Sequence, residues 1–218
     1  MLAGEAAIAI WNGITDAGRD DFYAWHVNEH MPERVGIPGF RRGRRYISAD
    51  AVTHPEFFTL YELETLQVAQ GQDYANRLNA PTPWTRRATA QFRDTFRVLA
   101  RVVESRGPGM GAALLTVRFD IDDPTRVLQV LRAAMATPRI CGVHLGKGDG
   151  AASAVRTVES EGRTDIKPPP AWFLLAEATD VAALENVLGD DALAEAGARG
   201  MERGLYRLEY VRSRTAWS

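Results

Sequence analysis

The chain has 218 residues, 45% hydrophobic and 25% charged, a composition typical of a globular protein with a substantial core. Its 26 lysines and arginines are balanced by 28 aspartates and glutamates, so no overall positive field favours nucleic acid as a partner. The single cysteine, Cys141, excludes an intrachain disulfide and a cysteine-rich metal site, which favours a reducing compartment.

The sequence also argues against a membrane. No stretch approaches the roughly 20 apolar residues that a spanning helix needs. The opening residues, MLAGEAAIAIW, carry Glu5 inside their apolar run and have no basic start, so they predict a strand rather than a signal peptide. We therefore expect a cytoplasmic protein without membrane contact.

The first half of the chain predicts the element order βαββαβ. Residues 5–11 are a short apolar run that ends at Asn12-Gly13, the pattern of a strand followed by a turn. A helix is expected from Asp16, a suitable N-cap, to about Arg34. Strands over 39–48, 56–64 and 92–104 and a second helix over 66–79 complete the order of a ferredoxin-like unit.

The second half repeats this order after Gly107-Pro108-Gly109. The repeat is clearest where FFTLYELETL and WFLLAEATDV place Glu62 and Glu177 at matching positions. We therefore predict a ferredoxin-like repeat over residues 1–106 that carries the candidate site, and a second over residues 110–218 that serves mainly as scaffold. In the second repeat, strands are expected over 112–119, 139–146, 171–178 and 204–213, and helices over 123–136 and 180–196.

The two predicted repeats imply a particular packing. Each has an antiparallel sheet with helices on one face, and its other face is apolar and uncovered. Two such repeats can bury these faces against each other. The predicted fold is therefore α+β, with tandem ferredoxin-like repeats packed as an α+β barrel of antiparallel sheets. A ligand is expected either between the sheets or between one sheet and its helices.

Most residues suited to chemistry lie in the first predicted helix and the strand after it. His26 and His30 are one helical turn apart and share a face. The corresponding helix of the second half, TRVLQVLRAAMA, contains no histidine, so a reactive site is expected in the first half. A structural interpretation stays open, in which His26 is a buried ring with a backbone partner and His30 is favoured by the helix dipole.

A zinc site is an alternative for the same stretch. HVNEH matches the H-x-x-E-H motif of inverted zinc peptidases, in which two histidines bind the metal and the glutamate activates water. The third ligand should be a downstream acid on a neighbouring helix, whereas Glu62, Glu64 and Glu104 fall on predicted strands. The sequence therefore predicts no metal site.

The stretch contains Phe22, Trp25, His30 and Pro32, followed by Pro38-Gly39-Phe40, and in this spacing it resembles the EthD-like members of the dimeric α+β barrel superfamily. Their pattern is F-x-x-[YW]-W-x-x-x-H-x-P, followed by P-G-[LF]-x-x-Y. The sequence departs from it at His26, where tryptophan is common. The superfamily includes cofactor-free monooxygenases, cyclases, isomerases, haem enzymes and members without known activity. The matching residues are Phe22, Trp25, His30, Pro32, Pro38, Gly39, Phe40 and, with a longer spacing, Tyr46.

The resemblance implies a role for His30. It would face an apolar pocket between helix and sheet and act as general base toward an acidic C–H or phenolic O–H. His26 is a second candidate base, and Tyr46 and Tyr61 would help to hold a developing enolate or phenolate. The residues expected to contact the substrate are Phe22, Trp25, Arg34, Arg45 and Trp84, the last from an irregular segment that would form a lid or a surface loop.

The arginines of residues 39–48 have two interpretations. Arg41, Arg42, Arg44 and Arg45 alternate between the two faces of a strand, so at most two can point into one pocket. Together with Arg34 they could bind a carboxylate or a phosphate. They could equally protect an edge strand from aggregation by their charge.

Three functions remain open at this point. The first is a cofactor-independent enzyme, of monooxygenase, cyclase or isomerase type, acting on a small aromatic or polyketide-like molecule. The second is a non-catalytic small-ligand-binding or stress-response module, so the sequence leaves open whether the protein is an enzyme. The third is a haem-binding protein with His26, His30 or His144 as axial ligand. Exposed sheet edges favour a homodimer.

Overall fold

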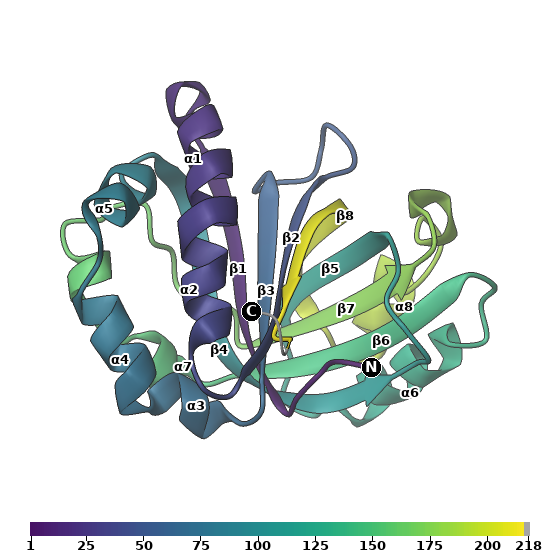
Figure 1. The fold of residues 1–218 in the computed structure, drawn as a ribbon. Helices are drawn as coiled ribbons and strands as arrows, with labels where there is room; N and C mark the ends of the chain where they lie inside the picture. Colours follow the sequence, from purple (N-terminus) through teal and green to yellow (C-terminus); the bar gives the residue numbers. More distant parts are fainter. Residues whose placement is uncertain (216–218) are drawn as a thin grey trace.

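The computed structural model of the protein describes residues 1–215 and has the predicted α+β architecture (Figure 1). Its strands are antiparallel to their neighbours and close into a barrel in the order β1-β3-β2-β8-β5-β7-β6-β4. The strands are β1 (Ala6–Ile14), β2 (Phe40–Ser48), β3 (Phe57–Leu63), β4 (Phe92–Arg106), β5 (Ala113–Asp120), β6 (Ile140–Gly148), β7 (Trp172–Ala178) and β8 (Arg199–Ser213).

The strand order confirms the tandem repeat. The first four strands lie in the order β4-β1-β3-β2 and the last four in the order β8-β5-β7-β6, so each half has the same ferredoxin-like arrangement. The halves join where β2 pairs with β8 and where β4 pairs with β6. Because β2 has a partner on both sides, the edge-strand interpretation of its arginines is wrong. The same closure removes the exposed edges on which the expectation of a homodimer rested.

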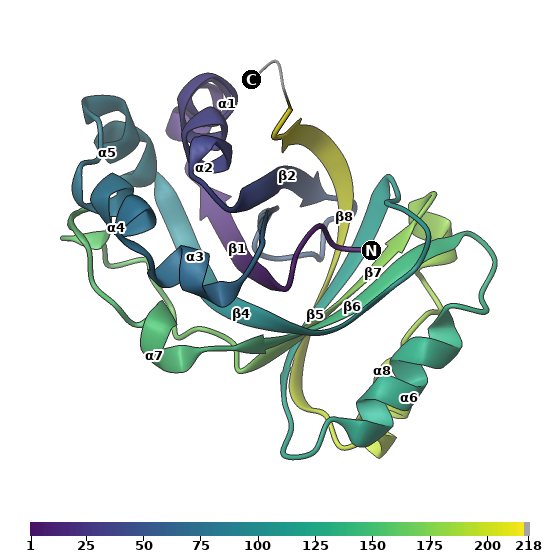
Figure 2. The same ribbon diagram turned by 60° about the horizontal axis from the view of Figure 1, so that its bottom comes forward.

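The helices lie outside the barrel, at two opposite sides of it (Figure 2). One continuous helix covers the first-half sheet, formed by α1 (Arg19–Trp25), η2 (His26–His30) and α2 (Met31–Gly36). Within residues 1–215 no helix is long and apolar enough to cross a membrane. The other helical segments are η1 (Asp16–Gly18), α3 (Leu66–Gln70), α4 (Gln72–Asn79), α5 (Pro83–Thr89), α6 (Thr125–Ala134), α7 (Gly150–Ser153), η3 (Val158–Ser160), η4 (Val181–Ala183) and α8 (Asp190–Glu195).

Three predicted elements were wrong. The helix expected over 66–79 is broken into α3 and α4 at Gly71, whose backbone is extended. The helix expected over 180–196 is broken into η4 and α8, because Leu188 adopts a positive φ of 56° and Gly189 follows it as the N-cap of α8. The irregular segment expected around Trp84 is instead the helix α5. Thr82 caps it by accepting a hydrogen bond from the Thr85 N–H, and Pro83 occupies its first turn.

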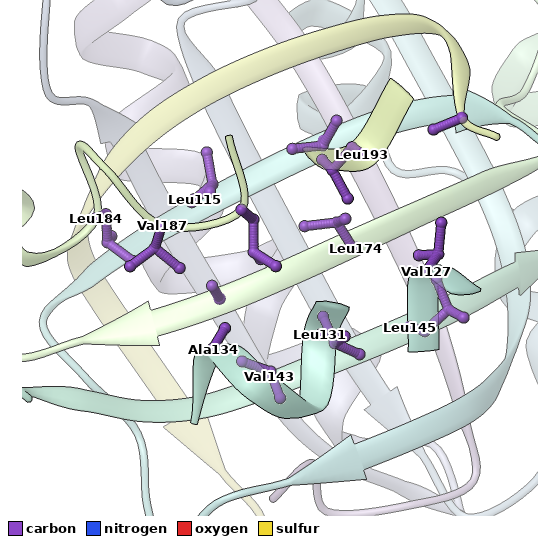
Figure 3. Close-up of a cluster of buried hydrophobic side chains, with 14 of the residues drawn as sticks. Leu115, Val127, Leu131, Ala134, Val143, Leu145, Leu174, Leu184, Val187 and Leu193 are labelled. Atoms are coloured by element: carbon purple, nitrogen blue, oxygen red, sulfur yellow. The ribbon is translucent and has the colours of Figure 1, made fainter. Parts of the chain in front are cut away.

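Strand alternation divides the core into an interior and two outer layers. On β3, Phe58 and Leu60 point into the barrel, whereas Phe57, Tyr61 and Leu63 face the first-half helices. In the second half, α6 packs on the outer face of the sheet with residues from the segment before α8 (Figure 3). The side chains in that layer include Leu115, Val127, Leu131, Val143, Leu145, Leu174, Leu184, Val187 and Leu193.

The barrel interior contains a charged cluster built on the matching glutamates. Arg44 Nε lies 2.8 Å from Glu62 Oε1, and Arg44 Nη1 donates to Glu177 Oε2 at 2.8 Å. His144 Nε2 lies 3.1 Å from Glu177 Oε1, and its Nδ1 lies 2.9 Å from Ser105 Oγ. The repeat thus places Glu62 and Glu177 on either side of a single buried arginine.

Candidate functional site

A widened helical turn positions the two histidines of the first half. Residues His26–His30 form a π-turn, in which the Met31 N–H donates to the carbonyl of His26, five residues back. The turn directly precedes Pro32, which has no N–H to donate and whose ring would crowd the carbonyl of Asn28 in a regular α-helix. Such turns are frequent at functional sites. The sequence did not predict this turn.

The π-turn stacks the histidines in a row of aromatic rings. The ring centroids of His26 and His30 lie 5.6 Å apart, with planes 22° from parallel. His30 packs on the indole of Trp25 at 4.2 Å, and His26 packs on Phe22 at 5.2 Å. His26 is 3% exposed and His30 is 7% exposed. The pair is therefore a buried aromatic stack rather than a surface pair.

The two imidazoles differ in their polar partners. Arg45 Nη1 lies 3.3 Å from Nδ1 of His26. Because a guanidinium can only donate, that nitrogen must carry a lone pair. Nδ1 of His30 is buried and has no hydrogen-bond partner among residues 1–215, and the same holds for the hydroxyl of Tyr61. The Tyr61 ring lies edge-on to His30 at 6.3 Å.

Electrostatics keep both imidazoles neutral. Burial lowers the pKa of His30 well below its ordinary 6.5, and the positive charge of Arg34 and the neighbouring His26 lower it further. Burial, Arg45 and Arg34 act on the pKa of His26 in the same direction. Burial raises the pKa of Tyr61, so its phenol remains protonated. The cluster therefore offers an acceptor nitrogen and a donor hydroxyl at neutral pH.

Arg34 forms the boundary of this cluster. Its side chain is 3% exposed, and its guanidinium pairs with the carboxylate of Glu159 in η3, on the connection between β6 and β7. It also lies 5.9 Å from the centroid of the Tyr74 ring on α4. A residue from the second half thus completes the surroundings of the first-half helix.

Beyond Arg34 lies a cavity of about 700 Å³. Its walls are α3, α4, β4 and the connection after β6, and Tyr74 and Glu159 belong to its lining. His26 and His30 do not line it. Ile10, on β1, pairs with the cavity residue Arg97 on one side and with Thr59 on the other, and it stays partly exposed beneath the helices. A row of paired residues thus runs across the sheet from Arg97 in the cavity wall through Ile10 to Thr59.

The structure brings together most of the predicted site residues. Phe22, Trp25, Arg45 and Tyr61 surround the histidines, with Arg34 at the boundary.

Two predicted site residues, Tyr46 and Trp84, lie away from the histidine cluster. Tyr46 projects into the barrel interior, where its ring lies 5.7 Å from the Arg44 guanidinium, because it follows Arg45 on β2 and neighbouring residues of a strand face opposite sides. Trp84 donates to Asp21 at 2.9 Å and is outside the cavity lining.

The residues do not fit a metal or a haem. Within the described chain no three His, Cys, Asp or Glu side chains are grouped to hold a metal ion. Glu29, the expected activator of water, instead accepts hydrogen bonds from Thr82 and Thr85. Both ring nitrogens of His144 are occupied by Ser105 and Glu177. None of the three candidate axial histidines lines the 700 Å³ cavity.

Comparison with known proteins gives the fold. The sequence matches no protein-family model and no curated protein. Among solved structures, an anthrone oxidase-like protein is similar over 95% of this chain and 92% of its own, with 11% identity and a TM-score of 0.58. The chain has the α+β barrel fold.

Two further solved structures share the barrel. A predicted monooxygenase from Lactobacillus acidophilus NCFM is 9% identical over 96% of both chains, with a TM-score of 0.56. A predicted chlorite dismutase is 14% identical over 94% of this chain and 95% of its own, with a TM-score of 0.52. At these identities the similarity concerns the α+β barrel alone.

Proposed function

We propose that the protein is a cofactor-independent enzyme that removes a proton from an acidic C–H or phenolic O–H of a small aromatic or polyketide-like molecule. One observation carries the proposal: Nδ1 of His30 is buried without a hydrogen-bond partner among the described residues. Leaving such an atom unpaired costs on the order of 1–3 kcal/mol. A substrate proton would supply the missing partner.

His30 is the base in this proposal because it is neutral. A general base must hold a free electron pair at the working pH, and the lowered pKa of His30 meets that condition throughout the neutral range. The same low proton affinity means that the imidazolium forms only if the substrate anion is stabilised nearby. The reaction therefore needs an electrostatic partner for that anion.

Arg34 and Tyr61 are the proposed partners. A substrate oxygen that replaces the carboxylate of Glu159 would meet a guanidinium that is already buried and positioned. The unpartnered hydroxyl of Tyr61 can donate to the same oxygen. Both groups lie beside His30, so they stabilise negative charge as the proton leaves. Monooxygenase, cyclase and isomerase chemistry share this step and differ in what the anion does next.

The proposal requires the Glu159 segment to move. Glu159 in η3 closes the cavity toward Arg34, and its neighbour Val158 is held by a 3.2 Å hydrogen bond from its N–H to the side-chain oxygen of Asn79. Releasing these two contacts would join the cavity to the histidine cluster. Closure of such segments over bound substrates commonly excludes water from the reaction.

A small-ligand-binding module is the second candidate. It is favoured by one observation, namely that His30 does not line the cavity. In that case the cavity binds a ligand without chemistry, and the histidine stack serves only the packing of the helix on the sheet.

Proton exchange distinguishes the two candidates. Anthrone, whose methylene protons are acidic, is incubated with the protein in D₂O buffer without oxygen, and deuterium incorporation is followed by NMR. We expect the protein to accelerate exchange and His30→Phe to reduce the acceleration by about 100-fold or more. His54→Phe, at an exposed loop position, is the matched control. Binding of anthrone without acceleration would favour the binding module, and equal rates for wild type and His30→Phe would exclude His30 as the base.

A further inference from the structure

The lining of the 700 Å³ cavity contains more basic than acidic side chains, although the chain as a whole does not. Its lining contains four basic side chains and two acidic ones, whereas the whole chain has a formal net charge of −2. An excess of one sign of charge in a cavity wall raises the local concentration of ligands of the opposite sign. The charged residues of the lining are Arg97, Arg156, Arg163, Lys167, Asp149 and Glu159.

Most of these charges already have partners. Arg163 pairs with Asp165, and Lys167 lies 3.2 Å from a carboxylate oxygen of Asp94. Glu159 pairs with Arg34, and the Asp149 side chain caps α7. Among residues 1–215, Arg97 and Arg156 have no carboxylate within 4.0 Å, and of the two only Arg97 is partly buried.

Arg97 is held in place at the inner wall of the cavity. It lies on β4 beside Ile10 of β1, on the side that leads toward the histidines. Its Nη2 donates to the Tyr74 hydroxyl at 2.9 Å, and its guanidinium carbon lies 5.9 Å from the centre of the Tyr74 ring. This contact fixes one edge of the guanidinium and leaves the other available to a ligand. The apolar wall nearby includes Leu78, Leu99 and Ile166.

We infer that the cavity takes a planar aromatic acid whose carboxylate is bound by Arg97. The planar guanidinium forms two parallel hydrogen bonds with a carboxylate, and a single arginine suffices for one such group. The ring would lie against the apolar wall. The inference rests on the proposed function, since it names the substrate class of the same site.

Binding of a matched ligand pair tests the inference. The probes are 2-naphthoate and 2-naphthamide, which share a ring and differ in charge, and calorimetry at pH 7.5 measures their Kd. We expect 2-naphthoate to bind at least about tenfold more tightly. Arg97→Gln should remove that difference, and Arg97→Lys should restore only part of it because a lysine cannot form the paired hydrogen bonds. The control is Arg101→Gln, at an exposed position of the same strand outside the cavity lining.

Each outcome bears on the inference. Equal affinities for the two probes, an equal loss of both in Arg97→Gln, or no binding of either at millimolar concentration would overturn it. A folded Arg97→Gln variant is verified by its thermal unfolding. The preference for 2-naphthoate over 2-naphthamide is measured on wild type and the Arg97 variants, whereas proton exchange with anthrone is measured on wild type and His30→Phe, so failure of the anion site and failure of the proposed chemistry give different results.

Discussion

The guanidinium of Arg34, in the last turn of the first-half helix, forms an ion pair with the carboxylate of Glu159, 125 residues later in the chain. Glu159 belongs to the connection between β6 and β7, whereas the equivalent connection between β2 and β3 is much shorter. This difference breaks the symmetry of the barrel. The longer connection thus reaches the first-half helix, which is the helix that carries the histidines.

Replacing Glu159 tests that contact. We expect Glu159→Gln to lower the free energy of unfolding by about 1–3 kcal/mol, less than for a fully buried pair because the Glu159 side chain is 16% exposed. The same variant should bind 2-naphthoate at least as tightly as wild type, since the carboxylate closing the cavity is gone. Urea unfolding and calorimetry measure the two effects. Glu161→Gln, exposed in the same connection, is the control, and equal stabilities of the two variants would contradict the role of the pair.

The packing of the helix on the sheet gives a second prediction. A Cβ at Gly43 would lie 2.1 Å from the sulfur of Met31 and 3.0 Å from the Tyr61 ring. Gly43→Ala should therefore destabilise the fold by about 1–3 kcal/mol. A Cβ at Gly36, the exposed last residue of α2, would meet no neighbouring atom within 4 Å, so Gly36→Ala should stabilise the fold by about 0.5–1 kcal/mol. Thermal unfolding of both variants checks the prediction, which is a lower melting temperature for Gly43→Ala and a higher one for Gly36→Ala.

Much of this fold was predictable because two patterns are strong in the sequence: the alternation of apolar residues along the strands and the repeated order of the elements. Strand alternation and the repeated element order predicted an α+β barrel built from two ferredoxin-like halves. The interruption around Leu188 and Gly189 was not predicted. The apolar pattern of residues 180–196 fits one continuous helix, and only Gly189 indicates a break within it. The closure that makes β2 a central strand depends on contacts between residues far apart in the chain.

Burial of the histidines predicts a pH-dependent stability. The pKa of His30 in the folded protein lies below its ordinary value of 6.5. As the pH falls below 6.5, the imidazole is therefore protonated in the unfolded chain while it stays neutral in the folded protein. Stability is therefore lost on acidification below pH 6.5, by up to about 1.4 kcal/mol per pH unit for each such histidine. His30→Phe should reduce that slope between pH 6.5 and 5. Urea unfolding at several pH values measures it, and an unchanged slope would show that the ring is not held neutral.

The barrel interior predicts a large effect at Glu177. Burial alone would raise its pKa, but the hydrogen bond from His144 and the charge of Arg44 lower it to about 2. The stability that this carboxylate contributes is present above pH 4.5 and is lost as the pH falls toward 2. At pH 7, Glu177→Gln should cost about 3–5 kcal/mol because it leaves Arg44 with one carboxylate fewer. Glu185→Gln, at an exposed position, should change the unfolding free energy by less than about 0.5 kcal/mol.

The candidate site was predictable only in part. The helix contributes its residues at a fixed spacing, so Phe22, Trp25, His26 and His30 could be grouped from the sequence. Tyr74, Arg97 and Glu159 were missed because their proximity depends on how α4, β4 and a connection without periodicity pack together. Tyr46 was assigned to the wrong face, since a strand sends neighbouring residues to opposite sides.

The pH dependence of proton exchange tests most directly whether a neutral, buried His30 acts as the base. The measured quantity is the rate of deuterium incorporation into anthrone by wild type minus the rate by His30→Phe, between pH 6 and 8. Because the pKa of His30 lies well below 6.5, the account predicts a difference that is large and constant over this range. A difference of zero, or one that rises with pH around a midpoint near 6.5, would contradict it.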